Sequence, residues 1–400
     1  MDYRSRQPAT PSVYGRFYFI FWSACAMINP FLGLYYESIG LDGLRIGYAG
    51  SVYFGFTVVS ALLVSYLIDR LGYVRKLLYI LSAVSIAGAA GIGTIGRGSF
   101  PVLILSVVLF AVGLGPFSTV IDELLVTSLK KTGASSEYSR YRNTGPLGYG
   151  LGVIVSGYLI QRFGVQVIVP AFMVLSFFVM VNHRNIPAVT DRENVRPGGK
   201  KSLQLKTLFT IRMFYFSMAC LFFWGAAESV FTQFLPIRMQ QHGFSTSATA
   251  WIVAASMAGE FLAYKITGML IKKISLPALI LISFIIQIIR YGVVLASDSI
   301  VFLILGQFIG GMSFAVIWPA ITECLALSVP PACASTAHAC KTVMVNGLGY
   351  VTGNMLCGYL YKYFGIDAAF RWFILFPAAA CIFIAVFLFF ERRAVKHKPA

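Results

Sequence analysis

Three ionisable residues of this sequence lie inside apolar stretches that are long enough to cross a membrane: Glu228, Glu260 and Arg290. A charge at the centre of a bilayer costs at least ~2.5–3.5 kcal/mol on insertion scales, so such residues usually face the interior of a helix bundle or a watery cavity. These three side chains therefore predict a pathway for a polar solute through the membrane.

The apolar residues around these charges occur in blocks of about 20, the length that a helix needs to cross ~30 Å of hydrocarbon. The chain has 400 residues, of which 58% are hydrophobic and 12% are charged, whereas a soluble domain carries roughly 25% charged residues. We therefore predict an all-α polytopic membrane protein with about twelve transmembrane helices. The predicted spans cover roughly 14–37, 45–68, 75–95, 100–127, 140–161, 164–182, 209–237, 246–270, 276–296, 299–326, 335–361 and 367–390.

Lys and Arg residues gather in every second loop, which is typical of cytosolic loops. This pattern predicts that both termini lie in the cytosol and that the first helix is retained rather than cleaved as a signal. The polar, basic segment 183–208 divides the chain into an N-terminal six-helix bundle, 1–182, and a C-terminal six-helix bundle with a short basic tail, 209–400. We interpret this segment as a solvated cytosolic linker, with a regulatory or lipid-headgroup site as the alternative.

The two halves share a sequence repeat. The pattern Leu-Gly-Tyr followed by Gly-Tyr-Leu occurs at 147–159 and again at 348–360. Repeated halves predict two pseudo-symmetric bundles with the solute site between them, near the midplane. The glycines of the repeat form small helical faces that predict either static packing or sliding of helices. They are Gly148, Gly152, Gly157, Gly349, Gly353 and Gly358.

Several other classes of function are disfavoured. The net charge of +17 comes from loops rather than from a basic stretch interleaved with aromatics, so we expect no nucleic-acid partner. The seven cysteines show no metal-ligand spacing, and we expect neither a metal nor a cofactor. The sequence contains neither a His-Glu-x-x-His motif nor a Gly-x-Ser-x-Gly motif, so an intramembrane enzyme is disfavoured.

Four stretches together resemble a known family. They are Pro30-Phe31-Leu32-Gly33-Leu34-Tyr35-Tyr36, the stretch from Ile68 to Lys76, Arg140-Tyr141-Arg142 and Gly259-Glu260-Phe261-Leu262. On these motifs the chain resembles the branch of the major facilitator superfamily that holds lactose permease and phenylpropionate permease. This branch implies a symporter that couples an oligosaccharide, a nucleoside or a small organic acid to protons. The chain departs from the pattern at Ser65, where a glycine is usual, and at Gly310, where the resemblance implies a histidine.

The resemblance implies a solute site on the fourth and fifth spans. Arg142 and either Glu123 or Asp122 match residues that hold the substrate's hydroxyls, and Tyr149 matches an aromatic that stacks on its ring. A planar guanidinium offers fixed donors and a carboxylate offers acceptors, so the group suits a polar solute. A tether between the two spans is the alternative interpretation. Asn29 and Gln307 are further substrate-binding candidates.

The resemblance also implies a proton-coupling group on later spans. Glu260 and Arg290 match a glutamate and an arginine that take part in coupling, because a cation that approaches and withdraws can switch the proton affinity of a buried carboxylate. A fixed structural ion pair is the alternative. We expect Glu228 to pair with Lys341 and so to keep the charges neutral, with contact to the solute as the alternative. His338, one turn earlier, is expected to act as a proton relay or as a neutral hydrogen-bonded side chain.

The loop between the second and third spans is expected to control conformation rather than to bind solute or protons. Asp69, Arg70 and Arg75 match a charge clamp that stabilises one conformation, with topology determination by positive charge as the alternative.

Together these features predict a monomeric, multi-pass secondary transporter of the cell membrane that moves a small polar solute, with protons, by alternating access. A facilitative uniporter and a non-transporting sensor that retains the fold are the alternatives.

Overall fold

The structure is a computed structural model that describes residues 11–71, 73–131, 137–186 and 207–396. The described residues are overwhelmingly helical, and no β-strand occurs among them. The helices of the first half are α1 (Pro11–Ile28), η2 (Asn29–Phe31), α2 (Leu32–Ser38), α3 (Gly43–Leu71), α4 (Val74–Gly93), η3 (Ile95–Arg97), α5 (Phe100–Leu114), α6 (Pro116–Lys131), α7 (Tyr138–Arg142), α8 (Thr144–Phe163), η5 (Val165–Val167), α9 (Ile168–Asn182) and η6 (His183–Asn185).

The second half continues in the same manner. Its helices are α11 (Arg212–Gln233), α12 (Leu235–Gln241), α13 (Thr246–Leu270), α14 (Leu276–Ala296), α15 (Ile300–Ser328), η8 (Pro331–Cys333), α16 (Ala334–Thr342), the π-helix η9 (Val343–Gly349), α17 (Tyr350–Phe364), α18 (Ile366–Phe373) and α19 (Leu375–Lys396). Residues 187–206 of the predicted linker and 397–400 of the predicted basic tail lie outside the described residues.

The predicted spans are all helical in the structure. Nine helical stretches of the described chain are long and apolar enough to cross a membrane. The predicted spans 140–161, 246–270 and 335–361 are not among these stretches, yet α8, α13 and the series α16–η9–α17 occupy them. These three segments are less apolar because they combine glycine, serine and threonine with charged residues such as Arg142, Glu260 and Lys341. Small residues of this kind suit close packing against other helices.

The chain divides into two compact units. Unit 1 comprises Met1–Gly199 and Thr232–Ala254, and unit 2 comprises Lys200–Phe231 and Ala255–Ala400. The segment Thr232–Ala254, which the sequence assigns to the second bundle, therefore groups with the first part of the chain. The division into bundles at 183–208 stays a prediction.

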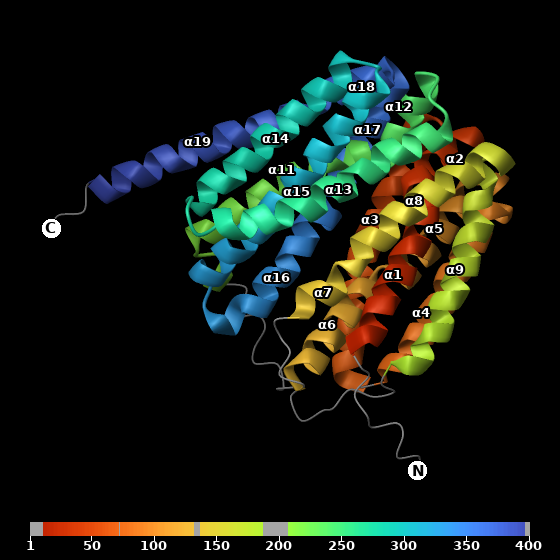
Figure 1. Ribbon diagram of the computed structural model, residues 1–400, viewed down its shortest axis with the longest axis horizontal. Helices are drawn as coiled ribbons and strands as arrows, with labels where there is room; N and C mark the ends of the chain where they lie inside the picture. Colours follow the sequence, from red (N-terminus) through yellow and green to blue (C-terminus); the bar gives the residue numbers. More distant parts are fainter. Residues whose placement is uncertain (1–10, 72, 132–136, 187–206, 397–400) are drawn as a thin grey trace, which may run out of the picture. The chain divides into compact units, whose positions relative to one another are not determined.

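Close packing of α8 on α1 is the main feature of unit 1 (Figure 1), which also packs α4 against α5 and α9. The contact depends on glycine. A Cβ atom added to Gly148 would lie 2.3 Å from the backbone oxygen of Phe19, and one added to Gly152 would lie 2.9 Å from that of Ser23. Any larger residue would force the two backbones apart.

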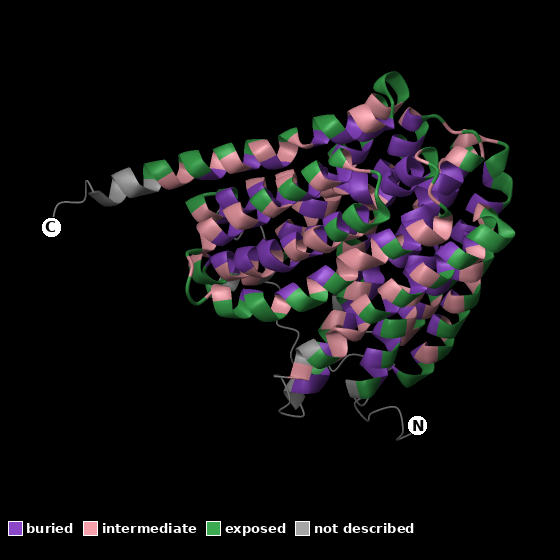
Figure 2. Cartoon of the chain, turned by 45° about the horizontal axis from the view of Figure 1, so that its top comes forward, coloured by how far each residue is buried: buried purple, intermediate pink, exposed green. Residues whose placement is uncertain are grey.

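Unit 2 repeats this packing between α11 and the helices η9 and α17. A Cβ atom added to Gly349 would lie 2.9 Å from the backbone oxygen of Phe222, and one added to Gly353 would lie 2.6 Å from that of Ala226. The sequence repeat thus corresponds to the same close helix contact in each unit. Elsewhere in unit 2, α14 packs against α15 and α19, and much of α19 is exposed or only half-buried (Figure 2).

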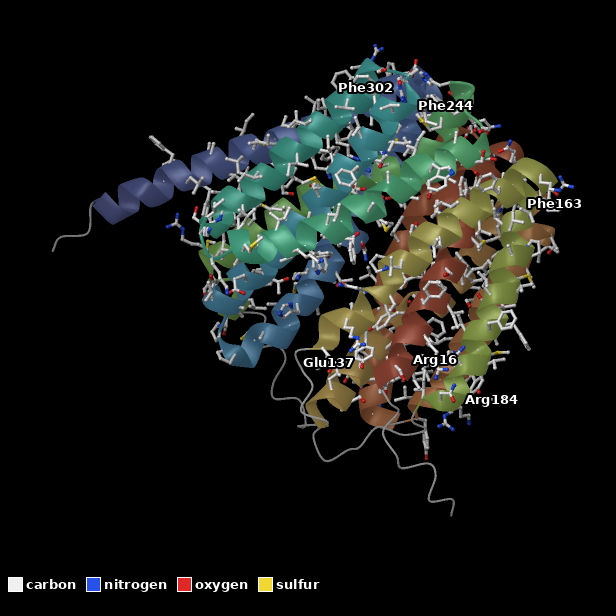
Figure 3. All side chains as sticks on the ribbon, viewed as in Figure 1. Arg16, Glu137, Phe163, Arg184, Phe244 and Phe302 are labelled. Atoms are coloured by element: carbon white, nitrogen blue, oxygen red, sulfur yellow. The ribbon has the colours of Figure 1, made fainter. Side chains whose placement is uncertain are left out.

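Labelled residues mark the two ends of unit 1. Arg16 and Arg184 lie at one end together with Glu137, whereas Phe163 and Phe244 lie at the opposite end (Figure 3). This arrangement agrees with the clustering of basic residues in alternate loops. That the basic end faces the cytosol stays a prediction.

The segment Thr232–Ala254 packs on α2 and α8 within unit 1. A Cβ atom added to Gly33 would lie 2.2 Å from the backbone oxygen of Gln233. The amide of Gln241 donates to a carboxylate oxygen of Glu37 at 3.0 Å, and the Thr246 hydroxyl donates to the carbonyl of Gly157 at 3.1 Å.

Candidate functional site

An ion pair on unit 1 brings α6 and the end of α7 together. The Nε atom of Arg142 lies 3.0 Å from Oδ1 of Asp122, and each side chain is about one-third exposed, at 33% and 32%. The hydroxyl of Tyr18 on α1 donates to the same carboxylate oxygen. The pair is thus partly accessible while it is held by three helices.

Aromatic rings surround this guanidinium. The Cζ atom of Arg142 lies 5.2 Å from the ring centroid of Tyr18 and 6.0 Å from that of Trp22. Tyr149 meets Trp22 edge-on, with ring centroids 6.1 Å apart. Tyr18 and Trp22 were not predicted, although two large aromatics one helical turn apart on a span signal a shared face.

Of the two adjacent carboxylates proposed as partners of Arg142, Asp122 forms an ion pair with it. Successive residues of an α-helix point about 100° apart, so only one of two adjacent carboxylates can face α1 and α7. Glu123 is exposed instead. We call the group of Tyr18, Trp22, Asp122, Arg142 and Tyr149 the unit 1 cluster.

A second polar cluster lies within unit 2. The guanidinium of Arg290 on α14 donates from Nη1 to Oε2 of Glu228 on α11 at 2.6 Å and from Nη2 to Oε1 of Gln307 on α15 at 2.6 Å. Gln287 donates to the same glutamate oxygen at 3.1 Å. The Arg290 Cζ atom also lies 3.6 Å from the ring centroid of Phe231. Arg290 is only 2% exposed, so three helices hold a nearly dry cation between a carboxylate and an amide. We call this group the unit 2 cluster.

The predicted pairing of Arg290 with Glu260 is wrong. Among the described residues Arg290 pairs with Glu228, whereas Glu260 is half-buried on α13 beside a tight crossing with α15. At that crossing a Cβ atom added to Gly259 would lie 1.9 Å from the backbone oxygen of Phe308. The choice of partner depends on which helix packs beside α14, and the sequence does not contain that information locally.

The structure shows why position 310 holds a glycine rather than the histidine that the resemblance implies. A Cβ atom at this position would lie 2.3 Å from Nε and 2.5 Å from Cζ of Arg290. The guanidinium therefore occupies the space into which a side chain at position 310 would project.

The expected pairing of Lys341 with Glu228 is also wrong. Lys341 is buried, its ammonium donates to the hydroxyl of Thr322, and it lies 4.1 Å from the ring centroid of Trp318. No ion pair of Lys341 occurs within the part of the chain that the structure describes. His338, one turn earlier, is exposed.

The remaining predicted residues lie apart from the two clusters. Asn29 accepts from the Tyr53 hydroxyl at 3.4 Å. Arg75 donates to the carbonyl of Ile186 at 2.6 Å, so it ties the start of α4 to the end of η6. Arg70 is exposed, and the side chain of Asp69 lies outside the described residues.

One buried histidine was missed. His183 is 0% exposed, its Nε2 atom lies 2.8 Å from the Ser82 hydroxyl, and its ring packs against Phe17 and Phe117 with centroids 5.8 and 5.7 Å away. The sequence places it at the start of a polar loop, which hides its burial. Among the described residues, no group of three or more His, Cys, Asp or Glu side chains is arranged to hold a metal ion.

Residues 13–372 match the model of a family described as the MFS_1 like family. The chain is 22% identical over 361 residues to the probable 3-phenylpropionic acid transporter of Escherichia coli (strain K12), covering 87% of this chain and 90% of the relative. It is 22% identical over 394 residues to the maltose permease of Geobacillus stearothermophilus, covering 98% of each.

Solved structures show the same fold. The nucleoside transporter NupG superposes with a TM-score of 0.80 at 16% identity, covering 94% of this chain and 98% of that chain. The D-xylose-proton symporter superposes with a TM-score of 0.72 at 13% identity, covering 94% of this chain. These proteins are transporters rather than enzymes, and together with the apolar helices they make the chain an integral multi-pass membrane protein. Family, fold and relatives are consistent with secondary active transport.

Proposed function

Because this chain belongs to the MFS_1 like family, we propose that it moves a small polar solute across the cell membrane by alternating access, in symport with protons. The proposal is supported by two ion pairs: Glu228 and Arg290 lie within apolar helices, and Asp122 on α6 pairs with Arg142 at the end of α7. Burying a charged side chain in the membrane costs free energy, and charged residues within membrane spans usually mark substrate or ion pathways.

The unit 1 cluster is the proposed solute site. Its central observation is the partly exposed pair of Arg142 with Asp122, which aromatic side chains surround. Hydroxyl groups of a solute can donate to the carboxylate and accept from the guanidinium, and Trp22 and Tyr149 offer apolar faces to a ring. Sugars, nucleosides and small organic acids all fit this chemistry, and relatives of the chain are named for such solutes. Asn29 and Gln307 stay secondary candidates for solute binding. Glu123 is exposed, and we do not include it in the proposed solute site.

The unit 2 cluster is the proposed coupling site. Arg290 bonds a carboxylate on one side and a neutral amide on the other, so the cation keeps a partner when Glu228 is protonated. Movement of Arg290 between Glu228 and Gln307 would then change the proton affinity of Glu228. We expected Glu260 to be the carboxylate whose proton affinity Arg290 controls. We now propose Glu228 for this role, because Arg290 contacts Glu228. A static pair would hold the helices together without a change of partner.

A two-step experiment tests the function. Thermal-shift screening of sugars, nucleosides and organic acids on the purified full chain identifies ligands, and uptake of each ligand is then measured in proteoliposomes. Saturable uptake that a pH gradient, acidic outside, accelerates and drives above the external concentration supports symport. Uptake that equilibrates regardless of the gradient would indicate a uniporter, and saturable binding without any flux would indicate a sensor.

A further inference from the structure

Lys341 is a buried cation without a counter-ion. Its side chain is 3% exposed, and within the described residues its only polar contact is with the hydroxyl of Thr322. Glu323 follows Thr322 on α15 but forms no ion pair with Lys341. A buried charge that is neither paired nor fully hydrogen-bonded is unfavourable. A bound anion would supply the missing negative charge and so stabilise this buried ammonium.

The hydrogen bonding around Lys341 leaves donors for such a ligand. The Thr322 hydroxyl donates to the backbone oxygen of Trp318 at 2.7 Å, so its lone pair accepts from the lysine. An ammonium group carries three donors, and one of them is used here. Two donors and the full charge stay available for the oxygens of an anion.

The surroundings of the ammonium favour a planar apolar body attached to that anion. Lys341 lies 4.1 Å from the ring centroid of Trp318. The Phe314 ring lies 5.6 Å from Trp318 and 5.3 Å from Trp224, and Phe314 and Trp318 are only half-buried. These three rings form a continuous aromatic row that begins at the cation, and aromatic rings pair with such a row in tilted or offset geometry.

The helices at this place are locally irregular. Pro319 interrupts the hydrogen bonding of α15 one residue after Trp318, and the π-helix Val343–Gly349 begins two residues after Lys341. A proline within a helix frees a backbone acceptor, and π-helical segments occur frequently at functional sites. Both irregularities flank the lysine and the aromatic row.

We infer that Lys341, Thr322 and the row of Trp224, Phe314 and Trp318 form a subsite for the carboxylate of an aromatic acid. The inference rests on the proposed transport function and narrows its solute class from polar solutes in general to aromatic monocarboxylates. The carboxylate pairs with the Lys341 ammonium in a charge-assisted hydrogen bond, and the ring of the acid lies against Trp318 and Phe314.

Binding of an acid and of its neutral amide to the purified full chain tests this subsite by isothermal titration calorimetry. Phenylacetate and phenylacetamide have the same shape and differ in charge. We expect phenylacetate to bind at least tenfold more tightly than phenylacetamide, and Lys341→Gln to abolish that preference. Lys265→Gln is the matched control, because Lys265 also lies near an aromatic ring, that of Phe261, but is exposed; it should keep the preference.

Folding of the variant is checked by its thermal unfolding. Lys341→Gln removes an uncompensated buried charge, so its unfolding temperature should equal or exceed that of the wild type. Equal binding of acid and amide by the wild type, or a preference that survives Lys341→Gln, would overturn the subsite. Uptake of a sugar in the absence of any preference for the acid would overturn the subsite and leave the transport function intact. Preference for the acid without uptake of any solute would support the subsite and overturn transport.

Discussion

At the scale of single residues, the ion pairs of the two clusters differ in exposure. Asp122 and Arg142 are about one-third exposed, whereas Arg290 is 2% exposed. Water and a solute can therefore reach the first pair more readily, while the second pair lies in a medium where protonation of the carboxylate strongly changes the interaction. This contrast is the reason for assigning the solute to one and the proton to the other.

Replacement of Arg142 by lysine should weaken solute binding by about 10- to 100-fold, from the ~1.5–3 kcal/mol of a hydrogen bond to a charged group. Lysine keeps the charge but loses the planar fork of donors. The measurement is the solute's dissociation constant in Arg142→Lys and Asp122→Asn. Glu123→Gln is the matched control, since Glu123 is the adjacent but exposed carboxylate, and it should bind as the wild type does. Unchanged affinity in Arg142→Lys would remove this residue from the site.

Replacement of Glu228 by glutamine should abolish accumulation driven by a pH gradient while leaving exchange of solute across the vesicle membrane. Glutamine mimics the protonated carboxylate and cannot release a proton. Accumulation and exchange are measured on the same proteoliposomes, with Glu260→Gln as the comparison. Loss of accumulation in Glu260→Gln alone would return the coupling role to the residue that the resemblance implies.

Replacement of Gly310 by alanine should lower stability through Arg290. The added Cβ would lie 2.3 Å from the Arg290 Nε atom, and overpacking of this kind costs roughly 1–3 kcal/mol. Thermal unfolding of Gly310→Ala, Arg290→Ala and the double variant gives a double-mutant cycle. We expect an interaction energy above ~0.5 kcal/mol, because removal of the guanidinium makes room for the methyl group. Additive effects would show that the two residues do not share this space.

At the scale of helices, the positions of the spans could be predicted because apolar runs of about 20 residues are a local property of the sequence. The repeat containing Gly148 and Gly349 was equally visible, and the structure gives both glycines the same close contact. The partners of Arg290 and Lys341 could not be predicted, because they depend on the rotation and neighbours of each helix. The burial of His183 was hidden for the same reason.

Replacement of Gly148 by alanine should lower the unfolding temperature, because its Cβ would lie 2.3 Å from the backbone of α1 and cost roughly 1–3 kcal/mol. Gly349→Ala should act in the same direction in unit 2. Gly268→Ala and Gly292→Ala are the controls, since a Cβ at either position meets no atom within 4 Å, and alanine favours a helix over glycine. An unfolding temperature of Gly148→Ala equal to that of the controls would contradict the close packing of α8 on α1.

At the scale of the whole molecule, alternating access requires contacts that can form and break without loss of the helical units. The segment Thr232–Ala254 contacts α2 and α8 within unit 1, and we expect these contacts to rearrange during transport while the helices themselves stay intact. They consist of close approaches at Gly33 and Gly157 and of single hydrogen bonds such as that from Gln241 to Glu37. Each hydrogen bond contributes only about 0.5–1.5 kcal/mol net, and a ligand shifts such an equilibrium by the difference between its affinities for the two states.

The most direct test of proton-coupled transport is the proton flux that accompanies the solute. A solute identified by the binding screen is added to weakly buffered proteoliposomes, and the external pH is recorded for the wild type and for Glu228→Gln. The wild type should alkalinise the medium upon addition of solute, and Glu228→Gln should bind the solute without this alkalinisation. Solute uptake by the wild type with no accompanying change in external pH would contradict the account.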